Sequence, residues 1–127
     1  MSATAIDRLA KSSNVSLTTY RTDGTPVATP VGGVVSDGTL YILSYANTGK
    51  LKRLRNDPRV IVAPCNSAGT IPPGAPRLEG TARLLDSEST RKAYRLMARK
   101  TFLARAARAF YLVRGKRDPW IGIEVTF

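Results

Sequence analysis

The sequence predicts a mainly β chain, a small barrel of about six antiparallel strands with a short helix after the third strand and a long helix before the last. Two observations carry this prediction. Short runs rich in β-branched and aromatic residues recur along the chain, which is typical of strands. Asp-Gly pairs at Asp23 and Asp37 follow the first two runs, and such pairs favour the tight turns of β-hairpins.

The first three runs, at residues 15–20, 27–35 and 40–45, are joined by these turns and predict a meander. The second run contains the segment Thr29-Pro30-Val31-Gly32-Gly33. Proline removes a backbone hydrogen-bond donor from a strand, and glycines remove side chains. Two interpretations stay open, a close approach by a flat ligand or a bend at a corner of the barrel.

A short helix is predicted at residues 47–56, with Asn47 as its cap and an Asp-Pro pair as its stop. Leu51 and Leu54 lie three apart, so they share one face of it. Directly after a glycine this segment carries four basic residues, Lys50, Lys52, Arg53 and Arg55. The free N–H groups of a helix start attract anions, so a phosphate would fit here. The alternative is a solvated basic face.

Residues 60–65 predict a buried strand, and Pro64 near its end predicts an unpaired edge or a break there. The following residues 66–76 are rich in glycine and proline, so they predict a surface loop and a candidate mobile flap. Residues 78–84 alternate between apolar and polar side chains, which predicts a strand with one wetter face.

A long helix is predicted from residue 87 to residue 113, because Leu96, Leu103 and Phe110 recur at intervals of seven. The last segment, residues 120–127, places four apolar side chains on one face. That alternation predicts a half-buried strand, which we expect to close the barrel.

The chain has 127 residues, 43% of them hydrophobic, which predicts a single domain over residues 1–127 with a packed core. Its 20 Lys and Arg residues outnumber its 9 Asp and Glu residues, so the net charge is +11. Such a field favours a polyanionic partner. Three kinds of partner stay open, namely nucleic acid, a phosphorylated cofactor and anionic lipid.

The sequence holds one cysteine, Cys65, and no histidine. One cysteine can form neither an intrachain disulfide nor a four-cysteine zinc site, and the lack of histidine excludes Ser-His-Asp and Cys-His catalysis. We interpret Cys65 as a small buried apolar residue. The acidic residues are scattered, so we predict no metal site and no catalytic side chain. In an enzyme of this composition the cofactor would do the chemistry.

The start of the chain lacks the basic and continuous apolar stretches of a signal peptide. No run approaches the roughly 20 apolar residues that a membrane span needs. We therefore expect a cytoplasmic protein that does not enter a membrane.

Between Ser89 and Arg117 the chain carries ten basic residues and no acidic one. A nucleic-acid interface would show such a pattern, but no aromatic ladder or zinc motif accompanies it. We therefore favour a solvated helix face that also attracts an anionic cofactor, and we do not expect nucleic acid as the partner.

Four segments stand in an order that resembles a known family. They are Asp-Gly-Thr-Pro-Val-Ala-Thr-Pro-Val at residues 23–31, Asn-Thr-Gly-Lys-Leu-Lys-Arg-Leu-Arg-Asn-Asp-Pro-Arg-Val at 47–60, Val-Ala-Pro-Cys at 62–65 and Leu-Glu-Gly-Thr-Ala-Arg-Leu-Leu at 78–85. Together they resemble the F420-dependent, pyridoxamine-phosphate-oxidase-like flavin and deazaflavin oxidoreductases. The segment from Gly49 to Val60 is the most specific part of this likeness.

The resemblance implies an FMN-binding split β-barrel that forms a homodimer, with FMN or coenzyme F420 in a groove between the subunits. It implies that the cofactor phosphate meets Lys50, Lys52 and Arg53, with Thr48 and Gly49 near it. It also implies that the ring is lined by Thr29, Pro30 and Val31 and by the neighbouring strand residues Ala63, Pro64 and Cys65. Coenzyme F420 carries a phosphodiester and a polyglutamate tail, which suits the basic excess.

Two departures from the family pattern matter. Gly32 and Gly33 stand where members often carry a bulky aromatic residue, so the substrate pocket is expected to be wider or shaped by another part of the chain. The chain ends Ile-Glu-Val-Thr-Phe and lacks the Trp-Arg and Arg-Leu-x-Pro pattern of true pyridoxamine-phosphate oxidases. We therefore do not expect vitamin B6 oxidation.

The first functional expectation is an F420-dependent reductase that passes a hydride to a small, conjugated organic acceptor. Such a transfer needs no histidine or nucleophile, because the cofactor carries the hydride. The second is an FMN-binding oxidoreductase of the same fold. The third is a non-enzymatic protein, either a cofactor carrier or a small barrel that binds nucleic acid.

Overall fold

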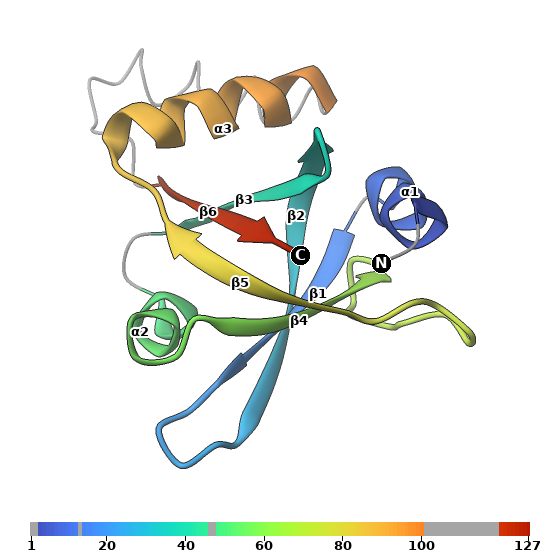
Figure 1. Ribbon diagram of the computed structural model, residues 1–127, viewed down its shortest axis with the longest axis horizontal. Coiled ribbons are helices and arrows are strands. Elements are labelled where there is room, and N and C mark those ends of the chain that lie inside the picture. The colour runs from blue at the N-terminus through green and yellow to red at the C-terminus, as the bar shows by residue number, and fades with distance from the viewer. Residues whose placement is uncertain (1–2, 13, 46–47, 101–119) are drawn as a thin grey trace.

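Six antiparallel strands close a barrel in the order β1-β2-β3-β6-β5-β4 (Figure 1). The strands are β1 (Asn14–Tyr20), β2 (Pro26–Ser36), β3 (Thr39–Tyr45), β4 (Arg59–Cys65), β5 (Leu78–Leu84) and β6 (Trp120–Thr126). The computed structural model describes residues 3–12, 14–45, 48–100 and 120–127. The predicted small barrel is confirmed, and each predicted strand boundary lies within one residue of the observed one.

Both predicted Asp-Gly turns are present. In the β1–β2 turn, Asp23 Oδ1 accepts a 2.9 Å hydrogen bond from the backbone N–H of Thr25, and Gly24 has a φ of +88°. In the β2–β3 turn, Asp37 and Gly38 have φ angles of 51° and 75°. Two consecutive positive φ angles define the type I′ turn, whose twist matches that of a hairpin.

Strand β2 changes partner halfway along its length. Its residues 26–32 pair with β1, whereas residues 33–36 pair with β3. Gly33 lies at the change, where a Cβ atom would approach Leu40 Cδ1 to 2.9 Å. The glycine therefore lets β2 bend closely over β3, which supports the interpretation of this segment as a corner of the barrel.

The core fills the barrel, and the helices pack against its strands. Leu17, Ile42, Val62, Ile123 and Val125 have no exposed surface. Helix α2 (Gly49–Asn56) adds its two predicted apolar residues to this core, and both are buried. The helix packs against β1 and β5.

Helix α1 (Ala3–Lys11) was not predicted from the sequence. It packs against β2 and β4 and adds Leu9, which is 1% exposed, to the core. In Figure 1 it lies well apart from α2. A helix this short has only Ile6 and Leu9 as an apolar spacing signal, which is too little to distinguish it from a loop.

Helix α2 differs from its prediction at the first turn. Its N-cap residue is Thr48, so the prediction that Asn47 caps it was wrong; Asn47 itself lies outside the described residues. The Thr48 side chain makes no capping hydrogen bond, because its Oγ1 lies 3.2 Å from Ser44 Oγ. The predicted stop is confirmed: the Asp57 N–H donates to the Arg53 carbonyl at 2.9 Å, and Pro58 follows.

Helix α3 (Ser87–Lys100) lies against the β3–β6 side of the barrel. Asp86 precedes it, and its Oδ1 accepts a 2.8 Å hydrogen bond from the Ser89 N–H. Ala93, Tyr94 and Met97 face the barrel and are buried. The continuation of this helix to residue 113 falls on residues 101–119, which lie outside the described residues.

Strand β4 has an unpaired edge where Pro64 was predicted to cause one. The strand pairs with β1 as far as Cys65, but its pairing with β5 ends at Val62. Pro64 lies beyond the part of β4 that pairs with β5, so its missing N–H costs no hydrogen bond to that strand. None of the helices in the described part of the chain has the length and hydropathy to cross a membrane.

Candidate functional site

Side chains from β3 and α2 meet at the first turn of α2. Ser44, the second-last residue of β3, is 3% exposed. Its Oγ accepts a 3.3 Å hydrogen bond from Lys50 Nζ and lies 3.2 Å from Thr48 Oγ1. Two hydroxyl groups and one ammonium group thus share a partly buried position.

Arg53 reaches the same turn from one helical turn further on. Its Nε donates a 2.7 Å hydrogen bond to Oγ1 of Thr19, a residue of β1 with no exposed surface. An ideal Cβ on Gly49 would lie 2.9 Å from Arg53 Nη1, so the guanidinium lies over the backbone of Gly49. We call Thr19, Ser44, Thr48, Lys50 and Arg53 the α2 cluster.

The α2 cluster concentrates positive charge. Burial lowers the pKa of the Lys50 ammonium below its usual 10.5, and the charge of Arg53 lowers it further. Within the described part of the chain, ion pairs join Asp57 to Arg59 and Arg83 to Glu124, so no carboxylate pairs with either cation of the cluster. An anion bound here would relieve both the desolvation and the repulsion.

Lys52 does not join the α2 cluster. It is exposed, and residues two apart on a helix point roughly 200° apart around the axis. Arg55 is exposed as well. Of the three cations that the resemblance assigns to a phosphate, the structure brings together Lys50 and Arg53, with Thr48 and Gly49 beside them.

The two segments assigned to the ring lie on either side of β1. Pro30 pairs with Ser16, which pairs in turn with Ala63 on the other side. Val31 and Pro64 flank Val15 in the same way. Thr29 lies one residue further along β2, and Cys65 ends β4.

These six residues do not share one face of the sheet, because successive residues of a strand point to opposite sides. Thr29, Val31 and Pro64 share the core-facing side with the buried Val15 and Leu17. The opposite side carries Pro30, Ala63 and Cys65. Among the six, Pro30 alone is exposed and Thr29 is half-buried.

The loop after β4 packs on this region. Asn66 Oδ1 accepts hydrogen bonds from the N–H groups of Ala68 at 3.0 Å and Thr70 at 2.9 Å. This arrangement places Gly69, with a φ of +91°, so that its Cβ position lies 3.6 Å from Pro30 Cγ. The predicted surface loop therefore lies beside the one exposed residue of the ring-lining set.

Cys65 has no features of a nucleophile. It is 5% exposed, and burial raises the pKa of its thiol above the usual 9.0. The thiol therefore stays protonated at neutral pH. This agrees with its interpretation as a small buried apolar residue.

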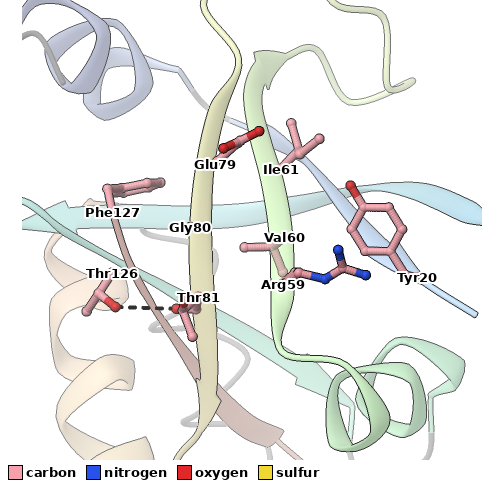
Figure 2. A pocket seen from close by; sticks show the side chains of 9 residues that line it. All are labelled: Tyr20, Arg59, Val60, Ile61, Glu79, Gly80, Thr81, Thr126 and Phe127. Carbon is pink, nitrogen blue, oxygen red and sulfur yellow. Dashed lines mark hydrogen bonds between the residues drawn. The ribbon is translucent and has the colours of Figure 1, made fainter. Parts of the chain in front are cut away.

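Sequence reasoning missed a cavity of about 480 Å³ at the other end of β4 (Figure 2). The residues that line it come from the end of β1, the first halves of β4 and β5, and the end of β6 with the residue after it: Tyr20, Arg59, Val60, Ile61, Glu79, Gly80, Thr81, Thr126 and Phe127.

One side of this cavity is held by charged and aromatic contacts. Arg59 donates to Asp57 at 2.7 Å, and its Cζ lies 5.2 Å from the centre of the Tyr20 ring. Hydrogen bonds from Arg59 hold the pKa of the Asp57 carboxyl below its usual 3.8. The Asp-Pro-Arg spacing was the only sequence signal for this corner, and none of the predicted site residues lines the cavity.

A protein-family model described as pyridoxamine 5'-phosphate oxidase matches residues 2–119. No curated protein matches the sequence. Among solved structures, a protein from Listeria innocua that is named for a proposed pyridoxamine 5'-phosphate oxidase activity is 20% identical, with a TM-score of 0.65. That match covers 97% of this chain and 90% of the other.

Two further structures carry other names. An FAD-binding protein from Mesorhizobium loti is 18% identical over 100% of this chain and 90% of that one, with a TM-score of 0.63. HutZ, the haem storage protein from Vibrio cholerae, is 13% identical over 94% of this chain and 84% of that one, with a TM-score of 0.64. At such identities the likeness shows a common split-barrel fold.

Proposed function

The chain belongs to the pyridoxamine 5'-phosphate oxidase family, and from this premise we propose that it is an oxidoreductase that binds a phosphorylated deazaflavin or flavin. The proposed cofactor is coenzyme F420, and the proposed substrate is a small conjugated acceptor. The proposal treats residues 1–127 as one cofactor-binding domain.

One observation carries the proposal, the meeting of Lys50 and Arg53 at the first turn of α2 beside two hydroxyl groups. Lys50 Nζ lies 3.3 Å from Ser44 Oγ, and no carboxylate among the described residues neutralises either cation. The buried Ser44 hydroxyl donates to the Tyr45 carbonyl at 3.3 Å and accepts from Lys50. The two cations and the Thr48 hydroxyl beside them form a donor set that suits a phosphate group. The α2 cluster therefore fits the phosphate end of the cofactor.

Coenzyme F420 is favoured over other phosphorylated ligands by the charge of the chain. The net charge of +11 attracts the phosphodiester and the oligoglutamate tail, which extend the negative charge of this cofactor beyond its phosphate. The absence of histidine is compatible with a reaction in which the bound cofactor supplies the hydride. The role of the protein is then to bind and orient.

FMN is the second candidate, because its phosphate would bind to the same donors of the α2 cluster and the matching family is named for a flavin-type oxidase. A non-enzymatic carrier is the third, since one structural neighbour is a haem storage protein. We do not extend haem storage to this chain, because it has no histidine and histidine is a common axial ligand of haem.

We also propose that the cofactor groove lies between two copies of the chain. Residues 26–32 of β2 pair with β1 alone among the described strands, so one edge of this segment faces outward next to exposed Pro30. A second copy would cover such an edge. Light scattering is expected to give the mass of a dimer, and a monomer that keeps full cofactor affinity would contradict the shared groove.

Cofactor titration tests the proposal directly. Purified protein is titrated with coenzyme F420 and with FMN in parallel, following the fluorescence of each. Saturable F420 binding, weakened by Lys50→Ala, is the expected result. Saturable binding of FMN alone would select the second candidate, and binding of neither would overturn the cofactor-binding proposal.

A further inference from the structure

We propose that Thr19 and Gly49 are positioning residues for Arg53, which they fix in a single orientation over the first turn of α2. The proposal rests on the proposed function, because it treats Arg53 as one side of the phosphate site. It goes beyond that function by naming the two residues, distant in sequence, that decide where the guanidinium points.

Thr19 holds one edge of the guanidinium. It lies in β1 with no exposed surface, and its Oγ1 accepts a 2.7 Å hydrogen bond from Arg53 Nε. The bond joins residues 34 positions apart in the chain. Because Nε donates to Thr19, the Nη groups are left to bind a ligand. Strand β1, which carries Thr19, sets the direction in which they point.

Gly49 leaves the room that the guanidinium occupies. A Cβ on this residue would lie 2.9 Å from Arg53 Nη1 and 3.8 Å from Arg53 Cζ, and outside its own neighbourhood no other atom of the described residues lies within 4 Å. Among the described residues, Arg53 alone therefore fills the space above Gly49. An alanine here would push aside the end of a flexible side chain and leave the backbone in place.

This arrangement opposes the stability of the helix. Glycine is the least favourable residue for a helix apart from proline, and a cation at the first turn faces the positive end of the helix dipole. Lys50 adds a second cation, whose pKa is lowered by burial and then further by the charge of Arg53. A bound anion would offset the helix-dipole and charge-repulsion terms, although it would leave the low helix propensity of glycine unchanged.

The decisive variant is Gly49→Ala, because it is expected to weaken binding without lowering stability. We expect an unchanged urea midpoint of unfolding, because the helix propensity that alanine adds offsets the hydrogen bond to Thr19 that the displaced guanidinium loses. We expect about three- to tenfold weaker binding of F420, or of FMN if that is the cofactor bound, as for the loss of one oriented hydrogen bond. A purely structural role for Gly49 would lower the midpoint together with the affinity.

Thr19→Val is the matching variant on the barrel side. It keeps the shape of the residue and removes the acceptor of Arg53, so we expect a similar loss of affinity, restored by Thr19→Ser. In an Arg53→Ala background neither Thr19→Val nor Gly49→Ala is expected to weaken binding further, because both act through Arg53. Arg55→Ala, which removes an exposed charge from the same helix, serves as the control.

The outcomes separate this inference from the proposed function. If Lys50→Ala and Arg53→Ala both leave the Kd unchanged, the phosphate site itself is wrong. If those two variants lose affinity but Gly49→Ala and Thr19→Val do not, the positioning role is overturned and the phosphate site stands. Additive losses in the Arg53→Ala background would also overturn it.

Discussion

The backbone N–H of Gly122 in β6 donates a 2.9 Å hydrogen bond to Oγ1 of Thr90 in α3, and both residues are buried. A Cβ on residue 122 would lie 2.9 Å from Leu85 Cδ1 and 3.3 Å from Thr90 Cα. The missing side chain and the hydroxyl therefore act together to let the helix dock directly on the strand.

Substitution at this contact is expected to destabilise the fold. Gly122→Ala should lower the free energy of unfolding by about 1–3 kcal/mol through overpacking. Thr90→Val should lower it by about 1–3 kcal/mol, because a buried N–H loses its acceptor. Urea denaturation measures both. Gly32→Ala is the control, since no atom of the part of the chain that the structure describes lies within 4 Å of its Cβ position; an equal effect there would contradict the docking role.

Gly80 is expected to be similarly intolerant, for a different reason. Its Cβ position lies 2.8 Å from the Thr126 carbonyl oxygen and 3.2 Å from Phe127 Cδ1. A backbone atom cannot turn away as a side chain can, so Gly80→Ala should separate β5 from the end of β6 at a cost of roughly 1–3 kcal/mol. Urea denaturation measures the cost. An unchanged midpoint of unfolding would contradict it, because separating the two strands would then cost no free energy.

The cations of α2 are expected to differ in their effect on cofactor affinity. Lys50→Ala and Arg53→Ala should each remove a charge-assisted hydrogen bond worth about 1.5–3 kcal/mol, and so weaken binding about ten- to a hundredfold. Lys52→Ala should have a smaller effect that fades with salt, because its side chain is exposed. Titrations at low and high salt measure this difference, with Arg99→Ala on α3 as the control. Equal losses of affinity for all variants would indicate that the cofactor is attracted by the overall positive charge of the protein and not by a defined phosphate site.

As the pH rises, cofactor affinity is expected to fall at a lower pH than it would if Lys50 were an exposed lysine with an ordinary pKa. The pKa of Lys50 is lowered from 10.5, chiefly by burial, and the anion binds the protonated form. As the pH rises through this lowered pKa, the free protein loses the positive charge and the affinity drops. Lys50→Arg should hold its affinity to higher pH, since arginine keeps its charge. Identical profiles for the two proteins would show that Lys50 is not the titrating group.

The strands were predictable because their signals are local. The alternation in residues 120–127 and the Asp-Gly pairs at Asp23 and Asp37 depend on neighbours a few positions apart. The corner at Gly33 could be named only as one of two interpretations, because the close approach to Leu40 depends on the partner strand.

The candidate site was predictable as a basic segment and not as a geometry. Helical spacing alone separates Lys52 from Lys50 and Arg53, but the resemblance assigned all three to the phosphate. The start of the helix was also placed too early. The Thr19 partner of Arg53 gave no signal, since a threonine in a strand is ordinary. The cavity around Arg59 was missed because its walls come from four strands that only the fold brings together.

The position of β6 between β3 and β5 has a consequence for synthesis on the ribosome. Residues 39–45 and 78–84 leave the ribosome before residues 120–126, so each of these strands has an open edge until the later segment arrives. Open edges pair readily with other chains, and incompletely paired intermediates are prone to aggregate. Closure of the barrel is therefore a late event, and a chain stalled before Trp120 would be a natural target for chaperones.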